Sequence, residues 1–406
     1  MAMIRRVVES SGFTRDVVII GGCGRVGLPL GIAMASRGLS VTLFDINAAA
    51  VENVNKGLLP FMEDGAEKLM TTALQDGSLT ATTDAECIAA AAALVVIIGT
   101  PVDEHLNPDI QAVPRTIERC APYLRDGQLL VLRSTVHPGV TALVERQLQK
   151  LGRVIDVAFC PERIAEGRAM TELFELPQIV AARTPSALER AEKLFRHLTD
   201  RIARLRPEEA ELAKLFTNTW RYIKFATANQ FWMMANDAGL DFERIREAVR
   251  FDYPRAADMP GAGFAAGPCL FKDTMQLAAF NNNNFVLGHS AMLVNEGLPL
   301  YIVSKLGAKH ELSEMTVGVL GMAFKGGSDD TRESLAFKLR KLLQIRAREV
   351  LCTDPYVRDD RFLPLDEVLA KADLLVIAAP HEQYRELATD KIVVDMWGVT
   401  GRGVVV

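Results

Sequence analysis

The segment Val17-Val-Ile-Ile-Gly-Gly-Cys-Gly-Arg-Val-Gly27 decides the fold. It opens with four β-branched apolar residues, a run typical of a buried strand. Glycines follow at positions 22, 24 and 27 in the pattern GxGxxG, and residues 28–35 have a helical composition. This order of strand, glycine-rich turn and helix predicts the first βαβ unit of a doubly wound α/β domain.

Other apolar runs extend the predicted sheet, at residues 41–44, 93–98, 129–132 and 154–159. Strands that helices cover on both faces are apolar throughout, which favours a parallel sheet. The pattern changes at about Pro207, because residues 208–236 lack glycine and proline and predict one long helix. A second helix is predicted over residues 287–306.

The first pattern returns from Thr316 onward. A helix near residues 335–345 lies between apolar strands, which we expect at 317–321, 350–355, 372–380 and 391–395. We therefore predict an α/β protein with two Rossmann-like doubly wound domains joined by a central helical domain with a long helix. The expected boundaries are 1–204, 205–310 and 311–406.

The composition limits the class of protein. A chain of 406 residues with 49% hydrophobic and 24% charged residues is typical of a soluble, multidomain globular protein. Its net charge of -5 provides no basic field for nucleic acid or an anionic membrane. The N-terminal segment MAMIRRVVESSGFTRD lacks an apolar signal core, and no run reaches the roughly 18 apolar residues of a membrane span. We expect a cytoplasmic protein with neither a nucleic-acid nor a membrane partner.

The six cysteines, at positions 23, 87, 120, 160, 269 and 352, are scattered without CxxC pairs or neighbouring histidines. This spacing predicts neither a zinc site nor a disulfide framework, and we expect no metal. Each thiol therefore has to be judged individually.

The GxGxxG run predicts a dinucleotide site. Its first glycine permits the tight turn, its second lets a pyrophosphate approach the backbone, and its third lets the helix pack on the strand. The helix N-terminus then supplies free N–H groups and a partial positive charge. Asp45 ends the second strand, where a carboxylate would bind a ribose 2′-OH and repel a 2′-phosphate. We predict NAD rather than NADP, the alternative being a surface turn with an unrelated aspartate.

Five further blocks carry a resemblance to a known family: Gly99-Thr-Pro-Val-Asp103, Ser134-Thr-Val-His-Pro-Gly139, Cys160-Pro-Glu-Arg-Ile-Ala-Glu-Gly167, Cys269-Leu-Phe-Lys-Asp273, and Phe324-Lys325 with Asp330-Thr-Arg-Glu-Ser334. In this order, around a dinucleotide fingerprint, the chain resembles the UDP-glucose/GDP-mannose dehydrogenase family. The resemblance implies a nucleotide-sugar 6-dehydrogenase. Such an enzyme uses two NAD to oxidise C6 of a UDP-sugar to a uronic acid for polysaccharide biosynthesis.

Cys269 is the candidate nucleophile. It lies between the glycine-rich residues 261–267 and Lys272-Asp273, a setting that favours a thiolate. Most cysteines are small buried hydrophobes, and we assign Cys23 and Cys160 to packing. For Cys269 the resemblance implies a covalent thiohemiacetal and then a thioester.

The resemblance also implies roles for other residues. Lys214 and Asn218, on one helix face, would stabilise the developing oxyanion, unless they are an exposed lysine and its polar neighbour. Glu162 would act in thioester hydrolysis, and Thr135 and Asp273 would position water. The cofactor-binding set is Gly22, Gly24, Arg25, Val26, Gly27, Asp45, Thr100, Pro101, Thr135, Glu166, Lys272 and Arg332. The substrate-binding set is Glu162, Arg163, Ile164, Lys214, Asn218, Arg255, Phe264 and Lys325.

These motifs leave the identity of the sugar open. Tyr253-Pro-Arg255 resembles the UDP-N-acetylhexosamine branch, in which the arginine reaches across a homodimer, whereas Lys272-Asp273 resembles the UDP-glucose form. The loop Phe264-Ala-Ala-Gly-Pro-Cys269 lacks the family's paired glycines, which changes the expected pocket. We favour a UDP-N-acetylhexosamine such as UDP-N-acetylmannosamine, then UDP-glucose, then GDP-mannose.

Two other functions compete with this one. A two-electron hydroxyacid dehydrogenase would use the lysine and asparagine and leave Cys269 structural, but it needs no second nucleotide-binding domain. A non-catalytic nucleotide-sugar sensor would share the fold, but the intact set of Lys214, Asn218 and Cys269 argues against it.

Overall fold

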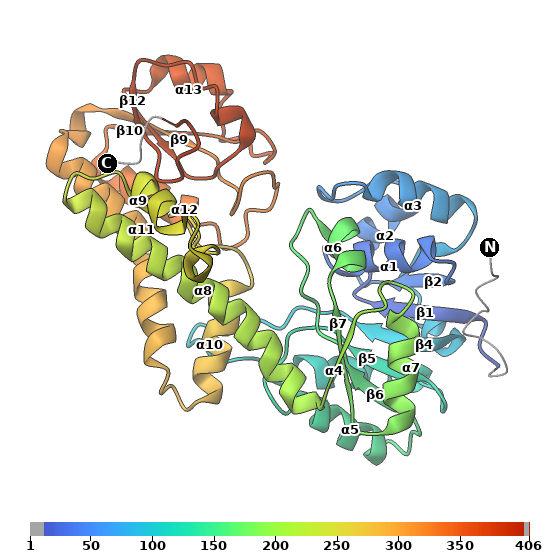
Figure 1. The fold of residues 1–406 in the computed structure, drawn as a ribbon. Coiled ribbons are helices and arrows are strands. Elements are labelled where there is room, and N and C mark those ends of the chain that lie inside the picture. Colours follow the sequence, from blue (N-terminus) through green and yellow to red (C-terminus); the bar gives the residue numbers. More distant parts are fainter. Residues whose placement is uncertain (1–11, 402–405) are drawn as a thin grey trace. The chain divides into compact units, whose positions relative to one another are not determined.

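The computed structural model describes residues 12–401 and 406; the preceding residues 1–11 of the N-terminal segment lie outside this description. The chain forms two compact units, Met1–Phe216 and Thr217–Val406. Figure 1 shows the elements of both. Nowhere in residues 12–401 is there a helix with the length and apolar character needed to cross a membrane.

The first unit is built on an eight-stranded sheet in the order β3-β2-β1-β4-β5-β6-β7-β8. All neighbouring strands are parallel except β6 and β7. The strands are β1 (Arg15–Ile20), β2 (Val41–Phe44), β3 (Leu79–Thr82), β4 (Ala91–Val96), β5 (Leu129–Leu132), β6 (Asp156–Phe159), β7 (Gln178–Ala182) and β8 (Ile202–Leu205). The order β3-β2-β1-β4-β5-β6 is that of a dinucleotide-binding fold, with its topological switch between β1 and β4.

Both faces of this sheet are buried, which explains why its strands are apolar throughout. Val17 and Ile19 of β1 pack in one hydrophobic cluster, and Val18 and Ile20 pack in another on the opposite face. The covering helices are α1 (Gly27–Ser36), α2 (Ala48–Asn55), α3 (Ala66–Gln75), α4 (Ala112–Cys120), α5 (Val140–Lys150), α6 (Ala169–Glu175) and α7 (Pro185–Phe195). Short 3₁₀ turns lie at Ala85–Ala90 and Ala121–Tyr123.

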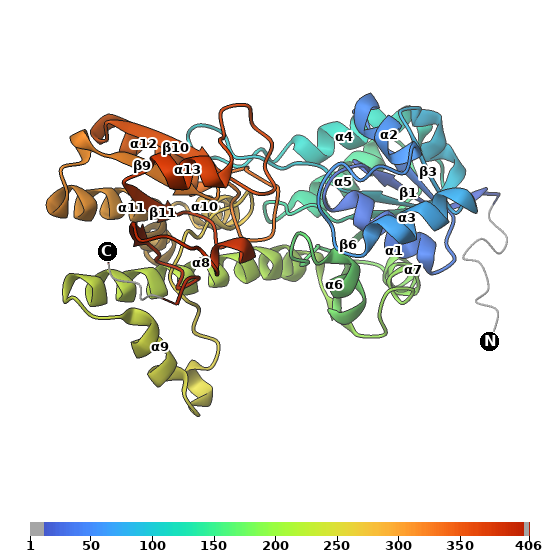
Figure 2. The same cartoon turned by 90° about the horizontal axis from the view of Figure 1, so that it is seen from above.

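The helix α8 (Pro207–Asp237) begins in the first unit and continues into the second. The second unit also contains α9 (Phe242–Arg250), α10 (Leu270–Phe280) and α11 (Val286–Lys309). In Figure 2, α9 extends away from the small sheet of this unit. A buried amide pair joins the two long helices: Asn229 Nδ2 donates to Asn295 Oδ1 at 2.9 Å, and Asn229 Oδ1 accepts from the Gly263 N–H.

A four-stranded parallel sheet completes the second unit, in the order β10-β9-β11-β12. Its strands are β9 (Thr316–Leu320), β10 (Glu349–Thr353), β11 (Leu374–Ile377) and β12 (Ile392–Val394), and its helices are α12 (Leu335–Arg346) and α13 (Leu365–Lys371). Further 3₁₀ turns lie at Pro254–Ala256, Leu312–Glu314 and Glu382–Tyr384.

The predicted fold class is confirmed: two parallel sheets of Rossmann type and one long helix are present. The strand expected at 93–98 begins and ends two residues earlier, because pairing with β1 stops at Val96. The short strands β3, β7 and β8 were not predicted. Thr or Arg interrupts the apolar residues of β3 and β8, and β7 has only five residues, the first of them Gln178. The division into three domains at 204 and 310 stays a prediction.

Candidate active site

Packing explains two of the three fingerprint glycines. A Cβ on Gly22 would lie 2.8 Å from the Ile19 carbonyl oxygen, and one on Gly27 would lie 2.5 Å from the Gly21 oxygen. Gly24 differs, because the nearest heavy atom to its Cβ position is 3.7 Å away and the residue is exposed. The space beside Gly24 is therefore open on the protein side, as expected where a pyrophosphate approaches the backbone.

Asp45 stands beside this loop. Its Oδ2 accepts a hydrogen bond from the Cys23 N–H at 3.0 Å, and its Oδ1 accepts one from the Asn47 N–H at 3.0 Å. A carboxylate has about four acceptor positions, so two remain for a ribose hydroxyl. Cys23 itself is buried, and burial with the nearby Asp45 charge raises the pKa of its thiol to about 12, which agrees with a packing role.

The ends of β4 and β5 form the neighbouring edge of the sheet. Ser134 Oγ accepts from the Ile98 N–H and donates to the Ile98 carbonyl, and Thr100 Oγ1 donates to the Thr135 carbonyl at 2.6 Å. Thr135 is half-buried and Pro101 is exposed. Of the remaining cofactor candidates in this unit, Val26 precedes α1, and Arg25 Nη1 pairs with Glu166 Oε1 at 2.5 Å. The structure thus places these candidates around the carboxyl ends of β1, β4 and β5.

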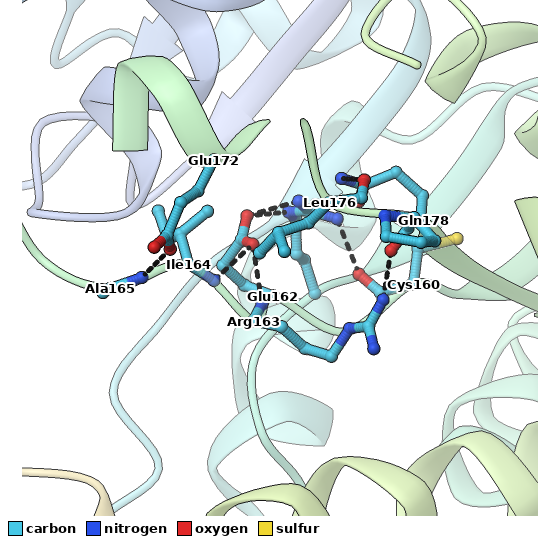
Figure 3. Close-up of polar contacts among 10 residues, drawn as sticks. Cys160, Glu162, Arg163, Ile164, Ala165, Glu172, Leu176 and Gln178 are labelled. Atoms are coloured by element: carbon cyan, nitrogen blue, oxygen red, sulfur yellow. Dashed lines mark hydrogen bonds and ion pairs between the residues drawn. The ribbon is translucent and has the colours of Figure 1, made fainter. Parts of the chain in front are cut away.

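Glu162 is held on both carboxylate oxygens. Its Oε1 accepts from the N–H groups of Arg163 and Ile164, at 2.7 and 3.0 Å. Its Oε2 accepts from Nε of the buried Arg133 at 2.9 Å and contacts the Nη2 of the same guanidinium. Figure 3 shows Glu162 at the centre of this network. Four N–H donors occupy its acceptor positions, so the carboxylate is fixed in place.

The rest of the segment 160–169 is fixed in the same way. Glu172 accepts from the Ala165 N–H at 2.6 Å, as Figure 3 shows. Glu63, from the distant loop before α3, accepts from the N–H groups of Gly167 and Ala169. Burial raises the pKa of Glu63, and these backbone donors oppose that shift. Three carboxylates therefore hold the segment that carries Glu162 and Glu166.

Glu211, near the start of α8, binds the N-terminus of α5 in the same unit. The buried carboxylate accepts from the N–H groups of Gly139 and Thr141, at 2.6 and 2.8 Å, and from Thr141 Oγ1 at 2.6 Å. Burial raises the pKa of Glu211 while these donors oppose the shift. Because Lys214 lies one turn further along α8, this contact fixes the lysine relative to residues 134–139.

The second unit brings together the residues around Cys269. This cysteine caps the N-terminus of α10 and is the exposed one among the six, all of which the structure describes. In the next turn, the fully buried Asp273 accepts from Asn218 Nδ2 at 2.5 Å and pairs with Lys272 Nζ at 3.1 Å. A helix N-terminus favours a thiolate, whereas the Lys272 ammonium pairs with Asp273. Lys214 and Asn218 are buried, so the alternative of an exposed lysine is wrong.

This unit also holds three further substrate candidates, Phe264, Lys325 and Arg255, and the cofactor candidate Arg332. Phe264 is buried against Trp397, and Lys325 is half-buried over the Phe324 ring. Arg332 is exposed and its guanidinium binds the buried Asp330. Arg255 is exposed beside Tyr253, away from these contacts. Among the described residues, no cluster of three or more His, Cys, Asp or Glu side chains could hold a metal.

Three residues that hold the site in place were not predicted from the sequence. Arg133 directly follows the apolar strand β5, and a charged residue at that position is a signal for the sheet edge. Glu211 precedes Lys214 by three residues and Asn218 by seven, so helical spacing places all three on one face. Glu63 offered no such signal, because its partners are more than 100 residues away.

Comparison with known proteins decides the family. Models of the UDP-glucose/GDP-mannose dehydrogenase family match residues 15–199 as its NAD binding domain, 208–296 as its central domain and 318–402 as its UDP binding domain. The chain belongs to this family. It is therefore an NAD-dependent nucleotide-sugar dehydrogenase.

Individual relatives agree with this assignment. A UDP-N-acetyl-D-mannosamine dehydrogenase of Pyrococcus horikoshii is 31% identical over 92% of each chain, and that of Escherichia coli K12 is 31% identical over 93% of this chain and 97% of its own. A solved UDP-D-ManNAc dehydrogenase from Pyrococcus horikoshii matches with a TM-score of 0.85 over 92% of this chain and 91% of that chain, at 31% identity. A UDP-glucose dehydrogenase from Pyrobaculum islandicum matches with a TM-score of 0.86 over 96% and 95%, at 29% identity.

The glycine geometry of this dehydrogenase yields a paired prediction. Gly24→Ala should fold normally but weaken NAD binding by on the order of tenfold, because the new methyl group enters the space of the pyrophosphate. Gly22→Ala should instead destabilise the first unit by about 1–3 kcal/mol, because its Cβ meets β1 and β2. Calorimetric titration with NAD and thermal unfolding separate the two effects. Unchanged NAD affinity in Gly24→Ala would contradict this account.

Proposed function

We propose that this dehydrogenase oxidises the C6 hydroxyl of a UDP-N-acetylhexosamine, such as UDP-N-acetylmannosamine, to the uronic acid in a four-electron reaction for polysaccharide biosynthesis. The observation that carries the proposal is the placement of Cys269. It is exposed at a helix N-terminus, one turn from a buried Asp273 that binds Asn218 and Lys272. A cysteine so placed suits covalent capture of an aldehyde.

The residues fit the cofactor. Gly24 leaves room for a pyrophosphate, and Asp45 has acceptor capacity for a ribose hydroxyl. The proposed cofactor set further includes Arg25, Thr100, Thr135 and Glu166. Lys272 and Arg332 stay cofactor candidates on the family resemblance alone. Bound NAD supplies the hydride acceptor for both oxidations.

The chemistry of the chain proceeds through Cys269. In the first oxidation the C6 alcohol loses a hydride and a proton and becomes an aldehyde, while Lys214 and Asn218 stabilise the negative charge on oxygen. The Cys269 thiolate then adds to the carbonyl carbon and forms a thiohemiacetal. Loss of a second hydride and of the hydroxyl proton gives a thioester, and hydrolysis by water releases the carboxylate and restores the thiol.

In this scheme Glu162 is not free to act as a general base. Its four N–H donors leave it no acceptor position for water, so activation of water requires one donor to leave. We propose that Glu162, held by Arg133, chiefly orients Arg163 and Ile164 toward the substrate. Thr135 and Asp273 remain our candidates for positioning the hydrolytic water.

Two features support a UDP-N-acetylhexosamine. The relatives described above include two named for UDP-N-acetyl-D-mannosamine, and Tyr253-Pro-Arg255 has the pattern of that branch. The Ala265-Ala266 pair stands where the family has paired glycines, which changes the expected pocket but favours neither sugar. UDP-glucose is the alternative, supported by the similar solved enzyme from Pyrobaculum islandicum, and GDP-mannose is third.

We further propose a cytoplasmic homodimer with three domains, 1–204, 205–310 and 311–406. NAD and nucleotide sugars are cytoplasmic metabolites. A second subunit would cover the exposed apolar side chains of α8 and α11, among them Trp220, Phe231, Leu293 and Leu300. The exposed Arg255 would then complete the site of the neighbouring subunit.

Stoichiometry tests the four-electron reaction. The wild-type enzyme should form two NADH per carboxylate, whereas a hydroxyacid dehydrogenase forms one per product and a sensor forms none. Cys269→Ser should lower steady-state turnover by at least about a thousandfold, because the hydroxyl is a far weaker nucleophile than a thiolate. Absorbance of NADH and chromatography of the uronic acid give the ratio of NADH to carboxylate, and the rate of NADH formation gives the turnover of each enzyme. Full activity of Cys269→Ser would rule out the covalent route.

A substrate panel tests the sugar. UDP-N-acetylmannosamine should give a higher kcat/KM than UDP-N-acetylglucosamine, UDP-glucose and GDP-mannose, by on the order of tenfold or more. NADH formation at matched concentrations measures each value. A higher kcat/KM for UDP-glucose would make UDP-glucose the substrate, without affecting the four-electron scheme.

Mixed dimers test Arg255. Cys269→Ala and Arg255→Ala should each be nearly inactive alone. Co-expressed at equal levels they should recover about a quarter of wild-type activity, because half of the dimers are mixed and each mixed dimer has one intact site. Co-expression of Cys269→Ala with a Cys269→Ala, Arg255→Ala double variant is the control and should recover nothing. Failure of the mixed pair to recover activity would place Arg255 in its own subunit's site, and full activity of Arg255→Ala alone would place it outside any site.

A further inference from the structure

His381 is a buried histidine that the scheme above does not use. It is fully buried in the turn that follows β11. Its Nδ1 accepts a hydrogen bond from the Gly327 N–H at 3.1 Å, and its Nε2 lies 3.1 Å from Asp354 Oδ2. Because Nδ1 accepts, the ring proton is on Nε2 and is donated to Asp354. Both ring nitrogens of His381 are therefore engaged in hydrogen bonds.

These contacts hold the loop of residues 321–334, which carries Lys325. At the start of the loop, the N–H groups of Met322 and Ala323 donate to Asp354 Oδ2, at 2.6 and 3.0 Å. At its tip, Gly327 donates to His381. The pair of Asp354 and His381 thus binds the loop on both sides of Lys325.

The backbone of the loop lies directly against the turn that carries His381. A Cβ on Gly326 would lie 2.2 Å from the Pro380 carbonyl oxygen, and one on Gly321 would lie 2.7 Å from Ala379 Cβ. Such close approach leaves no space between the loop and residues 379–381. The turn that carries His381 therefore restricts the conformation of the loop.

We propose that His381 is a positioning residue for nucleotide binding: together with Asp354 it fixes the 321–334 loop so that Lys325 meets the phosphates of the UDP-sugar. This inference rests on the proposed function, in which Lys325 binds the substrate. Without the imidazole, the Gly327 N–H loses its buried acceptor and Asp354 loses a donor. The loop then has to be ordered by the ligand, which lowers affinity.

Two substitutions at position 381 test the proposal. His381→Leu should weaken UDP binding and raise KM for the nucleotide sugar by about tenfold to a hundredfold, as expected for the loss of buried hydrogen bonds to a loop and a carboxylate. The value of kcat should change by less than about twofold, since Cys269 lies outside these contacts. NAD affinity should fall less than UDP affinity, since Arg332 is the one proposed cofactor residue in this loop. His381→Gln should restore most of the affinity, because its amide offers one acceptor and one donor.

Tyr384→Phe is the matched control. The Tyr384 ring lies 5.7 Å from the His381 ring in the same buried cluster, and its hydroxyl makes no hydrogen bond to the pair. This variant should bind UDP as the wild type does. Titration calorimetry with UDP and with NAD, steady-state kinetics and thermal unfolding cover all three variants, and a thermal unfolding transition like that of the wild type identifies folded protein.

A measurement on the wild type remains decisive even where His381→Leu fails to fold. In a long-range ¹H–¹⁵N spectrum, the imidazole that disappears in His381→Gln should have a protonated Nε2 and an unprotonated Nδ1. A protonated Nδ1 would overturn the inference, as would equal UDP affinity in the wild type and a folded His381→Leu. Failure of the wild type to bind UDP would instead overturn the proposed function.

Discussion

One interaction recurs in both sheets, and the two nucleotide-binding edges depend on it. A carboxylate at the end of the second strand accepts hydrogen bonds from the N–H groups of the loop that follows the first strand. Asp45 holds Cys23 in the first unit, and Asp354 holds Met322 and Ala323 in the second. The contact satisfies loop donors that would otherwise be orphaned where a strand turns into the next segment. It therefore fixes the loop before any ligand arrives.

The two carboxylates differ in how many donors they hold, and this difference separates the two sites. Asp45 accepts from two N–H groups and keeps capacity for a ribose. Asp354 accepts from four backbone N–H groups and from His381. Burial opposes its ionisation, but the hydrogen bonds and the histidine outweigh burial and lower the pKa of Asp354 to about 2. A saturated carboxylate has no place for a ligand. The second loop carries two cations, Lys325 and Arg332, and the Arg332 guanidinium already binds Asp330, so Lys325 is the candidate for contact with the nucleotide.

The sequence predicted what local patterns encode. Val17–Gly27 predicted the first βαβ unit because β-branched residues and glycines have strong local preferences. Helical spacing placed Lys214 and Asn218 on one face, and their burial bears this out. The hydrogen bonds that support the site were not predicted, because they join residues far apart in the chain: Glu63 with Gly167, Glu211 with Thr141, and Arg133 with Glu162. Nothing in the local pattern of a lone glutamate reveals which distant N–H group it will bind.

Burial determines which thiol is available for chemistry. Desolvation, with smaller electrostatic contributions, raises the pKa of Cys87 and Cys160 to about 12 and of Cys120 and Cys352 to about 11, as it does for Cys23. These five thiols stay protonated at neutral pH and are poor nucleophiles. Cys269 differs because it begins a helix, is exposed, and has Lys272 within the following turn. The buried cysteines thus serve as small apolar residues, whereas Cys269, among the six described thiols, is the exposed one and lies one turn before the buried Asp273 that binds Asn218.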